Sequence, residues 1–367
     1  MGASLSLPLH LLRLPPSLVD LAQTAGALTQ NGLSVVKGFA SDAMFSREVL
    51  EIDAAAVTAR IETALREQVL ATLKRRGLVV GLSGGVDSSV VAALAVRALG
   101  RDKVLALFMP ERDSSPDALR LGRLVAEALG VETVLEDVAP MLAGAGCYAR
   151  QAAAVRRLVP EYGEGWKCKI TLPSILESDR LNVFQLTVES PEGRRRAVRL
   201  TLEAQLELVA ATNLKQRARK TMEYYHADRL HYAVAGTPNR LEYDQGFFVK
   251  QGDGAADVKP IAHLYKTQVY RLAEHLGIPG EIRSRPPTTD TYSISQTQEE
   301  FYFSLPYDRM DLCLYARDHA VPASEVAPVV GLTAEQVRRV FRDIDAKRRT
   351  TNYLHLPPLL VEKVREG

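Results

Sequence analysis

A glycine-rich loop between an apolar run and a helical pattern constrains this chain more than any other feature. Residues 82–88 read Leu-Ser-Gly-Gly-Val-Asp-Ser; they follow Leu78-Val79-Val80 and precede a pattern of apolar residues from Ser89 to Leu99. A strand, a glycine turn and a helix in this order direct backbone N–H groups toward a phosphate at the helix N-terminus. We therefore expect this loop to bind phosphate groups.

The residue types in the loop indicate which phosphate chemistry it serves. Gly84 and Gly85 would let the backbone approach a pyrophosphate closely, and the hydroxyls of Ser83 and Ser88 could donate to it. Asp87 would repel phosphates unless a cation lay between them, so it predicts Mg²⁺. The loop is neither a Walker A motif nor GxGxxG. It resembles the pyrophosphatase loop of enzymes that split ATP between the α- and β-phosphates. The alternative is a plain turn with chance glycines, which the complete string disfavours.

The order of apolar runs and helical patterns predicts an α/β fold. Short continuous apolar runs are typical of strands that are buried on both faces of a parallel sheet. Alternation of such strands with helices favours a doubly wound, mostly parallel sheet with helices on both faces. We expect strands at 78–80, 104–109, 131–135 and 232–237, and helices at 53–74, 89–99 and 116–129.

Residues 141–212 interrupt this rhythm with a different pattern. Apolar residues alternate at 182–188 and again at 198–202, on either side of a Ser-Pro-Glu-Gly turn at 190–193. This pattern predicts an inserted β-hairpin at about 165–205. The arginines at 194, 195, 196 and 199 could grip phosphates or RNA, but a solvated hairpin face is the commoner explanation. We expect an N-terminal extension of unclear role at 1–47 and one ATP-pyrophosphatase domain at 48–367.

Composition excludes several other classes of protein. The formal net charge of +2 does not point to a polyanionic partner. Cys147, Cys168 and Cys313 are far apart and form no CxxC pair, which disfavours zinc sites and a disulfide scaffold. No apolar stretch is long enough to span a membrane, and the apolar N-terminus lacks the features of a signal peptide. We therefore expect a cytoplasmic protein with no membrane partner.

A second region, residues 213–290, is dense in polar residues at spacings that neither a helix face nor a strand face requires. It contains Asn-Leu-Lys-Gln-Arg-Ala-Arg at 213–219, Gly-Thr-Pro-Asn-Arg-Leu-Glu at 236–242, Gly-Asp-Gly-Ala-Ala-Asp at 252–257 and Leu-Tyr-Lys-Thr-Gln-Val at 264–269. Together with the loop at 82–88, this order resembles the NAD synthetase family over about residues 50–350. The resemblance implies an adenine nucleotide α-hydrolase-like fold.

The resemblance also implies an activity. Members of the family are homodimers that adenylate the nicotinate carboxylate of deamido-NAD with ATP and Mg²⁺, release pyrophosphate, and let ammonia displace AMP. The roughly 80 residues before the loop are too few for a glutaminase domain. We therefore expect free ammonia, or ammonia from a separate glutaminase, to be the nitrogen source.

Family roles carry over to matching positions of this chain. The resemblance implies that Asp87 and Glu242 hold Mg²⁺. It implies that ATP contacts the loop residues Ser83, Gly84, Gly85, Asp87 and Ser88, together with Thr237, Lys266 and Thr288, and that deamido-NAD contacts Arg217, Lys250, Asp257 and Lys347. Charge that develops during adenylation needs a lysine near the leaving pyrophosphate, and Lys266 is the best candidate. We expect Asp87, Lys266 and Asp290 to be catalytic, with Asp290 orienting ammonia or accepting its proton.

The chain departs from the family pattern around the carboxylate substrate. Gln298 stands where the family tends to have an acid, and Ala346 precedes Lys347 where a histidine is common. Residues 285–304 have few apparent apolar anchors, so we expect a closing loop there. Two alternatives stay open: an amide ligase of the same fold that acts on another small carboxylate, and a nucleotide-activating tRNA-modifying enzyme. The second would need a catalytic cysteine, but the three cysteines lie in no thiolation motif.

Overall fold

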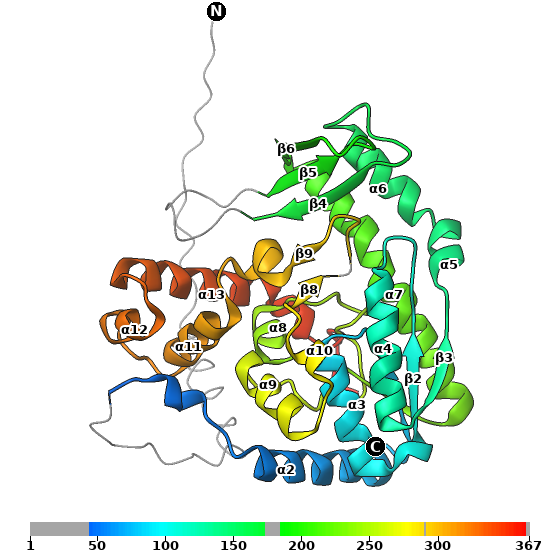
Figure 1. Cartoon of the computed structure of the whole chain (residues 1–367), viewed down its shortest axis with the longest axis vertical. Helices are drawn as coiled ribbons and strands as arrows, with labels where there is room; N and C mark the ends of the chain where they lie inside the picture. The colour runs from blue at the N-terminus through cyan, green and yellow to red at the C-terminus, as the bar shows by residue number, and fades with distance from the viewer. Residues whose placement is uncertain (1–43, 173–183, 290, 365–367) are drawn as a thin grey trace, which may run out of the picture. The chain divides into compact units, whose positions relative to one another are not determined.

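The computed structural model describes residues 44–172, 184–289 and 291–364 (Figure 1). The compact unit that contains the site begins at Phe45. A short 3₁₀ turn, Arg47–Leu50, opens it and buries Leu50. Within the described part of the chain, no helix is both long enough and apolar enough to cross a membrane.

The centre of this unit is a four-stranded parallel sheet. Its strands lie in the order β3 (Glu132–Leu135), β2 (Val104–Phe108), β1 (Leu78–Gly81) and β7 (Ala233–Ala235). Val80 pairs with Ala106 on one side and with Ala235 on the other. Every residue of β2 and β7 is buried, which explains why these strands read as continuous apolar runs. The predicted parallel sheet is confirmed.

Helices cover both faces of this sheet, as the doubly wound prediction requires. The side chains of Val80 and Ala106 belong to an apolar core shared with α2, α3, α4 and α9, whereas Val79 and Leu105 pack with α7 on the opposite face. The bounds are α2 (Ala54–Arg66, continued by a π-helical stretch, Glu67–Thr72), α3 (Val86–Leu99, followed by a 3₁₀ turn, Arg101–Lys103), α4 (Pro116–Leu129), α7 (Leu202–Leu230) and α9 (Lys266–His275).

The inserted segment is a small lobe of its own. It comprises α5 (Ala139–Gly144), α6 (Cys147–Arg156) and a three-stranded antiparallel sheet of β4 (Lys167–Thr171), β5 (Gln185–Glu189) and β6 (Arg195–Arg199). The structure contains the predicted hairpin as β5 and β6, but β4 was not expected. The predicted alternation extended to Leu202, which is wrong: Thr201 caps α7, so Leu202 begins that helix and is exposed. Residues 182–183 of the pattern lie outside the described residues.

The C-terminal part forms a second apolar core beside the sheet. Leu312, Val326 and Val340 lie at its centre. Its elements and the connections that lead to it are α8 (Arg240–Gln245), α10 (Gly280–Arg283), the two-residue strands β8 (Thr288–Thr289) and β9 (Gln296–Thr297), a π-helical turn η6 (Glu299–Phe303), α11 (Tyr307–Asp318), α12 (Ala323–Val330) and α13 (Ala334–His355).

Candidate functional site

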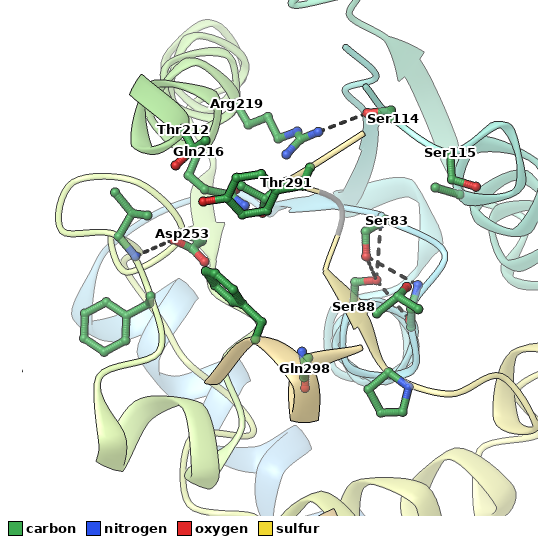
Figure 2. A pocket seen from close by; sticks show the side chains of 18 of the residues that line it. Ser83, Ser88, Ser114, Ser115, Thr212, Gln216, Arg219, Asp253, Thr291 and Gln298 are labelled. Carbon is green, nitrogen blue, oxygen red and sulfur yellow. Dashed lines mark hydrogen bonds between the residues drawn. The ribbon is translucent and has the colours of Figure 1, made fainter. Parts of the chain in front are cut away.

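A cavity of about 1140 Å³ opens at the carboxyl ends of β1 and β2 (Figure 2). This edge of a parallel sheet is where α/β proteins bind ligands. The lining includes Trp166 and Ile170 from the inserted lobe and Tyr353 from α13. Of the residues that the sequence predicted for the site, it includes Ser83, Gly84, Gly85, Asp87, Ser88, Arg217, Thr237, Glu242, Lys250, Lys266 and Thr288. The fold therefore brings most of the predicted set to one cavity.

The predicted phosphate loop turns between β1 and α3 with its polar groups toward this cavity. Gly84 has a φ of +76°, and a Cβ there would lie 2.6 Å from the carbonyl oxygen of Ala118, so only glycine fits. The Ser83 and Ser88 hydroxyl oxygens lie 3.1 Å apart. Both side chains are labelled in Figure 2. The Gly85 N–H donates to Ser83 Oγ over 3.3 Å at the start of α3. These hydroxyl and N–H groups are hydrogen-bonded to each other. The hydroxyl groups can rotate to donate to an incoming anion.

Asp87 and Lys266 form a buried ion pair beside the loop. The Lys266 ammonium donates to Asp87 Oδ2, and the Asn239 side chain donates to Asp87 Oδ1 over 3.1 Å. The Lys266 side chain is 2% exposed, against 16% for Asp87. Burial alone would lower the pKa of Lys266, but the carboxylates of Asp87 and Glu242 raise it above its ordinary value. The raised pKa and the ion pair with Asp87 both favour a charged ammonium next to the phosphate loop.

Glu242 is held close to this pair by a capping box at the start of α8. The Asn239 N–H donates to Glu242 Oε2 over 3.1 Å, so Asn239 links the two carboxylates that were predicted to hold Mg²⁺. Gln298 Nε2 donates to Glu242 Oε1 over 2.8 Å. Burial and the nearby Asp87 charge raise the pKa of Glu242 to about 7. No cluster of three or more metal-ligating side chains occurs among the residues that the structure describes.

The residues predicted to hold the second substrate divide into two groups. Arg217 Nε donates to the Lys250 carbonyl over 3.2 Å, and Lys250 Nζ donates to the Tyr353 carbonyl over 2.9 Å. Asp257 and Lys347 are not among the lining residues. The structure thus places the first group on the cavity, whereas Asp257 and Lys347 are not part of its lining.

Each of the two residues outside the lining has a partner that explains its position. Asp257 accepts the Val234 N–H over 2.7 Å and so holds β7. Lys347 is paired with Asp343 over 2.7 Å and donates to the carbonyl of Tyr302, whose residue does line the cavity. Asp290, predicted to be catalytic, lies outside the described residues.

The segment predicted to be a closing loop is anchored. Tyr292, Ile294 and Phe303 are each no more than 5% exposed, so the expectation of few apolar anchors is wrong. Residues 292, 294 and 296 are all buried, although residues 291–294 form bends and only residues 296–297 are a strand. The segment is a wall of the cavity.

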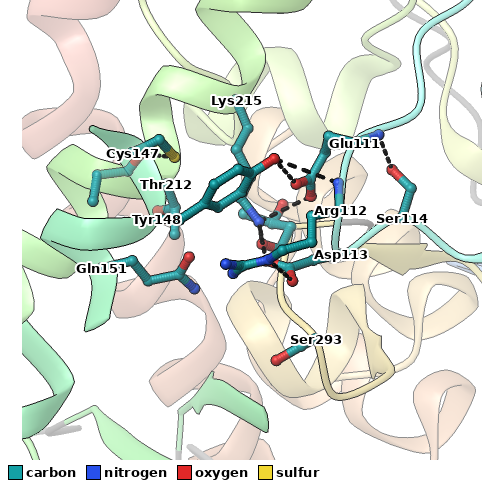
Figure 3. Close-up of polar contacts among 12 residues, drawn as sticks. Glu111, Arg112, Asp113, Ser114, Cys147, Tyr148, Gln151, Thr212, Lys215 and Ser293 are labelled. Carbon is teal, nitrogen blue, oxygen red and sulfur yellow. Dashed lines mark hydrogen bonds and ion pairs between the residues drawn. The ribbon is translucent and has the colours of Figure 1, made fainter. Parts of the chain in front are cut away.

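A buried charge cluster, which the sequence did not reveal, joins this wall to the sheet (Figure 3). The fully buried Lys215 on α7 donates to Glu111 Oε1 over 2.9 Å, to Asp113 Oδ2 over 2.7 Å and to the Thr291 carbonyl over 2.9 Å. The Tyr148 hydroxyl donates to Glu111 Oε2 over 2.9 Å. Lys215 therefore ties the loop after β2 to the segment that contains Gln298.

Arg219 and Asp253 are among the polar residues that line the cavity without having been predicted for the site. Arg219 donates to the Met109 carbonyl over 3.1 Å and to Ser114 Oγ over 3.2 Å, which fixes it at the end of β2. Asp253 accepts the Val249 N–H over 2.7 Å, and burial raises its pKa. Arg219 lies two positions from Arg217 in the same polar motif, so that motif was the available signal for it.

Comparisons with known proteins agree with this geometry. The model of a family described as NAD synthase matches residues 57–157 and 181–351. An NH(3)-dependent NAD(+) synthetase of Mesorhizobium japonicum is 64% identical over 318 residues, which cover 87% of this chain and 100% of the relative. An NH(3)-dependent NAD(+) synthetase of Rhizobium meliloti is 62% identical over 323 residues, which cover 88% of this chain and 96% of the relative.

A solved structure supports the fold alone. The NH3-dependent NAD synthetase from Campylobacter jejuni, in complex with the nitrate ion, has a TM-score of 0.55 at 20% identity. The match covers 85% of this chain and 100% of that chain. The predicted α/β fold with a parallel sheet is confirmed.

Proposed function

The chain belongs to the NAD synthase family of NH3-dependent NAD(+) synthetases, and we propose that it adenylates the nicotinate carboxylate of deamido-NAD with ATP and then forms the amide with ammonia. One observation carries the residue-level proposal. The phosphate loop, Lys266 and the carboxylates of Asp87 and Glu242 meet on one cavity at the carboxyl edge of the sheet. In this proposal residues 83–88 hold the triphosphate, and Thr237 and Thr288 contact the rest of ATP.

Asp87 and Glu242 fit the Mg²⁺ that the reaction needs. Magnesium ions prefer oxygen ligands and are commonly bound by one or two carboxylates together with substrate phosphates. Two linked carboxylates next to a phosphate loop, with no third acid required, match that donor set. When bound there, Mg²⁺ would neutralise charge on the departing pyrophosphate.

Lys266 supplies the cation that belongs to the chain itself. Its ammonium is buried and charged, and it lies beside the loop because it donates to Asp87. Fixed positive charge in a site that excludes water stabilises charge that develops on transferred phosphoryl groups. Attack by the nicotinate carboxylate forms a C–O–P linkage, and the bond between the α- and β-phosphates breaks. Lys266 then faces the pyrophosphate that leaves.

Amide formation needs the adenylate shielded from water until ammonia attacks. In this proposal Arg217 and Lys250 hold deamido-NAD directly, while Lys347 holds Tyr302 of the cavity lining and Asp257 holds β7. Attack by ammonia on the carboxyl carbon forms the C–N bond, breaks the C–O bond to AMP and requires a base for the extra proton. We assign that role to Asp290. The assembly is a homodimer in this proposal, and ammonia comes from solution or from a separate glutaminase.

The test is a coupled assay on the whole protein. With ATP, Mg²⁺, deamido-NAD and ammonium present, we expect NAD, AMP and pyrophosphate in equal amounts, and no pyrophosphate when deamido-NAD is omitted. Folded, Mg²⁺-loaded protein that releases no pyrophosphate on addition of deamido-NAD would overturn the proposal. Equal turnover of other pyridine carboxylates would refute the substrate assignment and leave the adenylation step standing.

A further inference from the structure

The inserted sheet has an edge that does not face solvent. Strand β4 pairs with β5 on one side only, so its other row of backbone groups needs partners. The Cys168 N–H donates to Ser293 Oγ over 2.9 Å, and its carbonyl accepts the Ile294 N–H over 3.2 Å. The free edge of β4 is therefore occupied by the cavity wall.

The contacts continue along the strand. The Gln296 side chain, 1% exposed, donates to the Ile170 carbonyl. The Leu172 N–H donates to the Glu300 carbonyl over 3.0 Å. Lys169 Nζ lies 3.0 Å from Glu300 Oε2, and the Lys169 side chain is only 14% exposed. Backbone, amide and charged contacts thus follow one another from residue 293 to residue 300.

The same segment reaches the proposed Mg²⁺ site. Gln298 lies between Gln296 and Glu300 and donates to Glu242, one of the two proposed Mg²⁺ ligands. At the other end Lys215 holds the Thr291 carbonyl. A displacement of this wall would therefore move Gln298 away from Glu242 and open the cavity.

We propose that the inserted sheet is a clamp that holds residues 291–300 against the cavity before any substrate binds, with Lys169 and Gln296 as positioning residues. The inference deepens the proposed function, on which its kinetic part rests. A wall that is ordered in advance spares the substrates the entropic cost of ordering it. Loosening the clamp should therefore raise KM more than it lowers kcat, because substrate that has bound can order the wall itself.

Hydrogen exchange tests the clamp without reference to activity. In protein without substrates, amides of residues 291–300 should be protected, and the double variant Lys169→Met/Gln296→Leu should speed their exchange about tenfold or more. Arg196→Met is the matched control: it removes an ion pair of the same sheet, 3.0 Å from Glu161, that does not touch the wall. It should leave that exchange unchanged. Fast exchange of the wall in the wild type would overturn the proposal.

Kinetics and charge reversal separate positioning from general stability. Lys169→Met should raise the KM for deamido-NAD several-fold, by up to about tenfold, with a smaller effect on kcat. Exchanging the charges in Lys169→Glu/Glu300→Lys should restore both KM and amide protection. A double variant that changes neither exchange nor KM, or a charge exchange that rescues nothing, contradicts the clamp. Inactivity of the wild type refutes the proposed function and leaves the exchange result to decide the clamp.

Discussion

Replacing Lys215 by methionine perturbs the buried charge cluster at its centre. Methionine has a similar length, so the space stays filled and the main change is the loss of the ammonium. The side chains of Lys215 and Glu111 are 0% exposed and that of Asp113 is 7% exposed. The change therefore leaves Glu111 buried without a cation, whereas Asp113 keeps Arg112, which donates to its Oδ1 over 3.0 Å and to its Oδ2 over 3.2 Å.

The burial of these groups sets the expected magnitude. Removing one partner of a buried ion pair costs about 3–5 kcal/mol, because the other charge stays desolvated. The total free energy of unfolding of a domain is about 5–15 kcal/mol, so this one change should remove a large share of it. Adding Glu111→Gln to Lys215→Met removes the buried carboxylate charge that has lost its cation. The double variant should therefore recover part of the lost free energy of unfolding.

Urea denaturation followed by circular dichroism measures this effect through the midpoint and slope of the transition. Arg120→Met is the control, since Arg120 pairs with Glu281 over 2.5 Å but both side chains are more than half exposed. Solvent screens such a pair, and little change is expected. If Lys215→Met lost no more stability than Arg120→Met, burial would not be the source of the cluster's strength.

Three further changes test the phosphate loop, the metal assignment and a buried acid. Gly84→Ala forces a side chain into a left-handed conformation, with its Cβ 2.6 Å from a carbonyl oxygen. It should lower the free energy of unfolding by at least about 1–2 kcal/mol, and an unchanged urea midpoint would contradict this. Asp87→Asn should reduce pyrophosphate release by several orders of magnitude, whereas Arg195→Ala should not; near-full turnover of the first would refute the metal assignment. Burial raises the pKa of Asp311 to about 7. The folded protein then keeps a proton that the unfolded chain releases near its ordinary pKa of 3.8, so stability relative to Asp311→Asn should fall as pH rises between these values, by up to about 1.4 kcal/mol per unit. If urea denaturation gave the same difference in the free energy of unfolding between the wild type and Asp311→Asn at about pH 5 and at pH 7, this reasoning would be refuted.

The features that could be predicted from the sequence are determined by residues close to them in the chain. The strands β1 and β2 are buried on both faces, so each is a continuous apolar run. Helix α4 ends where Gly130 takes a left-handed conformation, with a φ of +63°. The phosphate loop could be predicted because its two glycines stand directly between an apolar run and a helical pattern, and Gly84 takes a φ of +76° there.

Features that depend on distant partners could not be predicted in this way. Strand β4 reads Lys-Cys-Lys-Ile-Thr, a weak pattern whose stability comes from β5 on one edge and residues 293–300 on the other. A lysine on a helix is ordinarily exposed, and Lys215 is buried only because Glu111 and Asp113 reach it from about a hundred residues away. Asp257 belongs to a family motif, yet it accepts the Val234 N–H of β7 and is not part of the cavity lining.

The far edge of the inserted sheet has a consequence for handling the protein. Strand β6 ends the strand order and has no neighbour beyond it in the described sheet, and Arg195, Arg196 and Arg199 are exposed along it. An open strand edge can recruit the same edge of another molecule, and charged side chains along it disfavour such pairing. Arg195 and Arg196 are held at this edge in ion pairs with Glu189 and Glu161, so each already has a partner within the chain. Neutral residues at these three positions should leave turnover intact and make concentrated solutions scatter light.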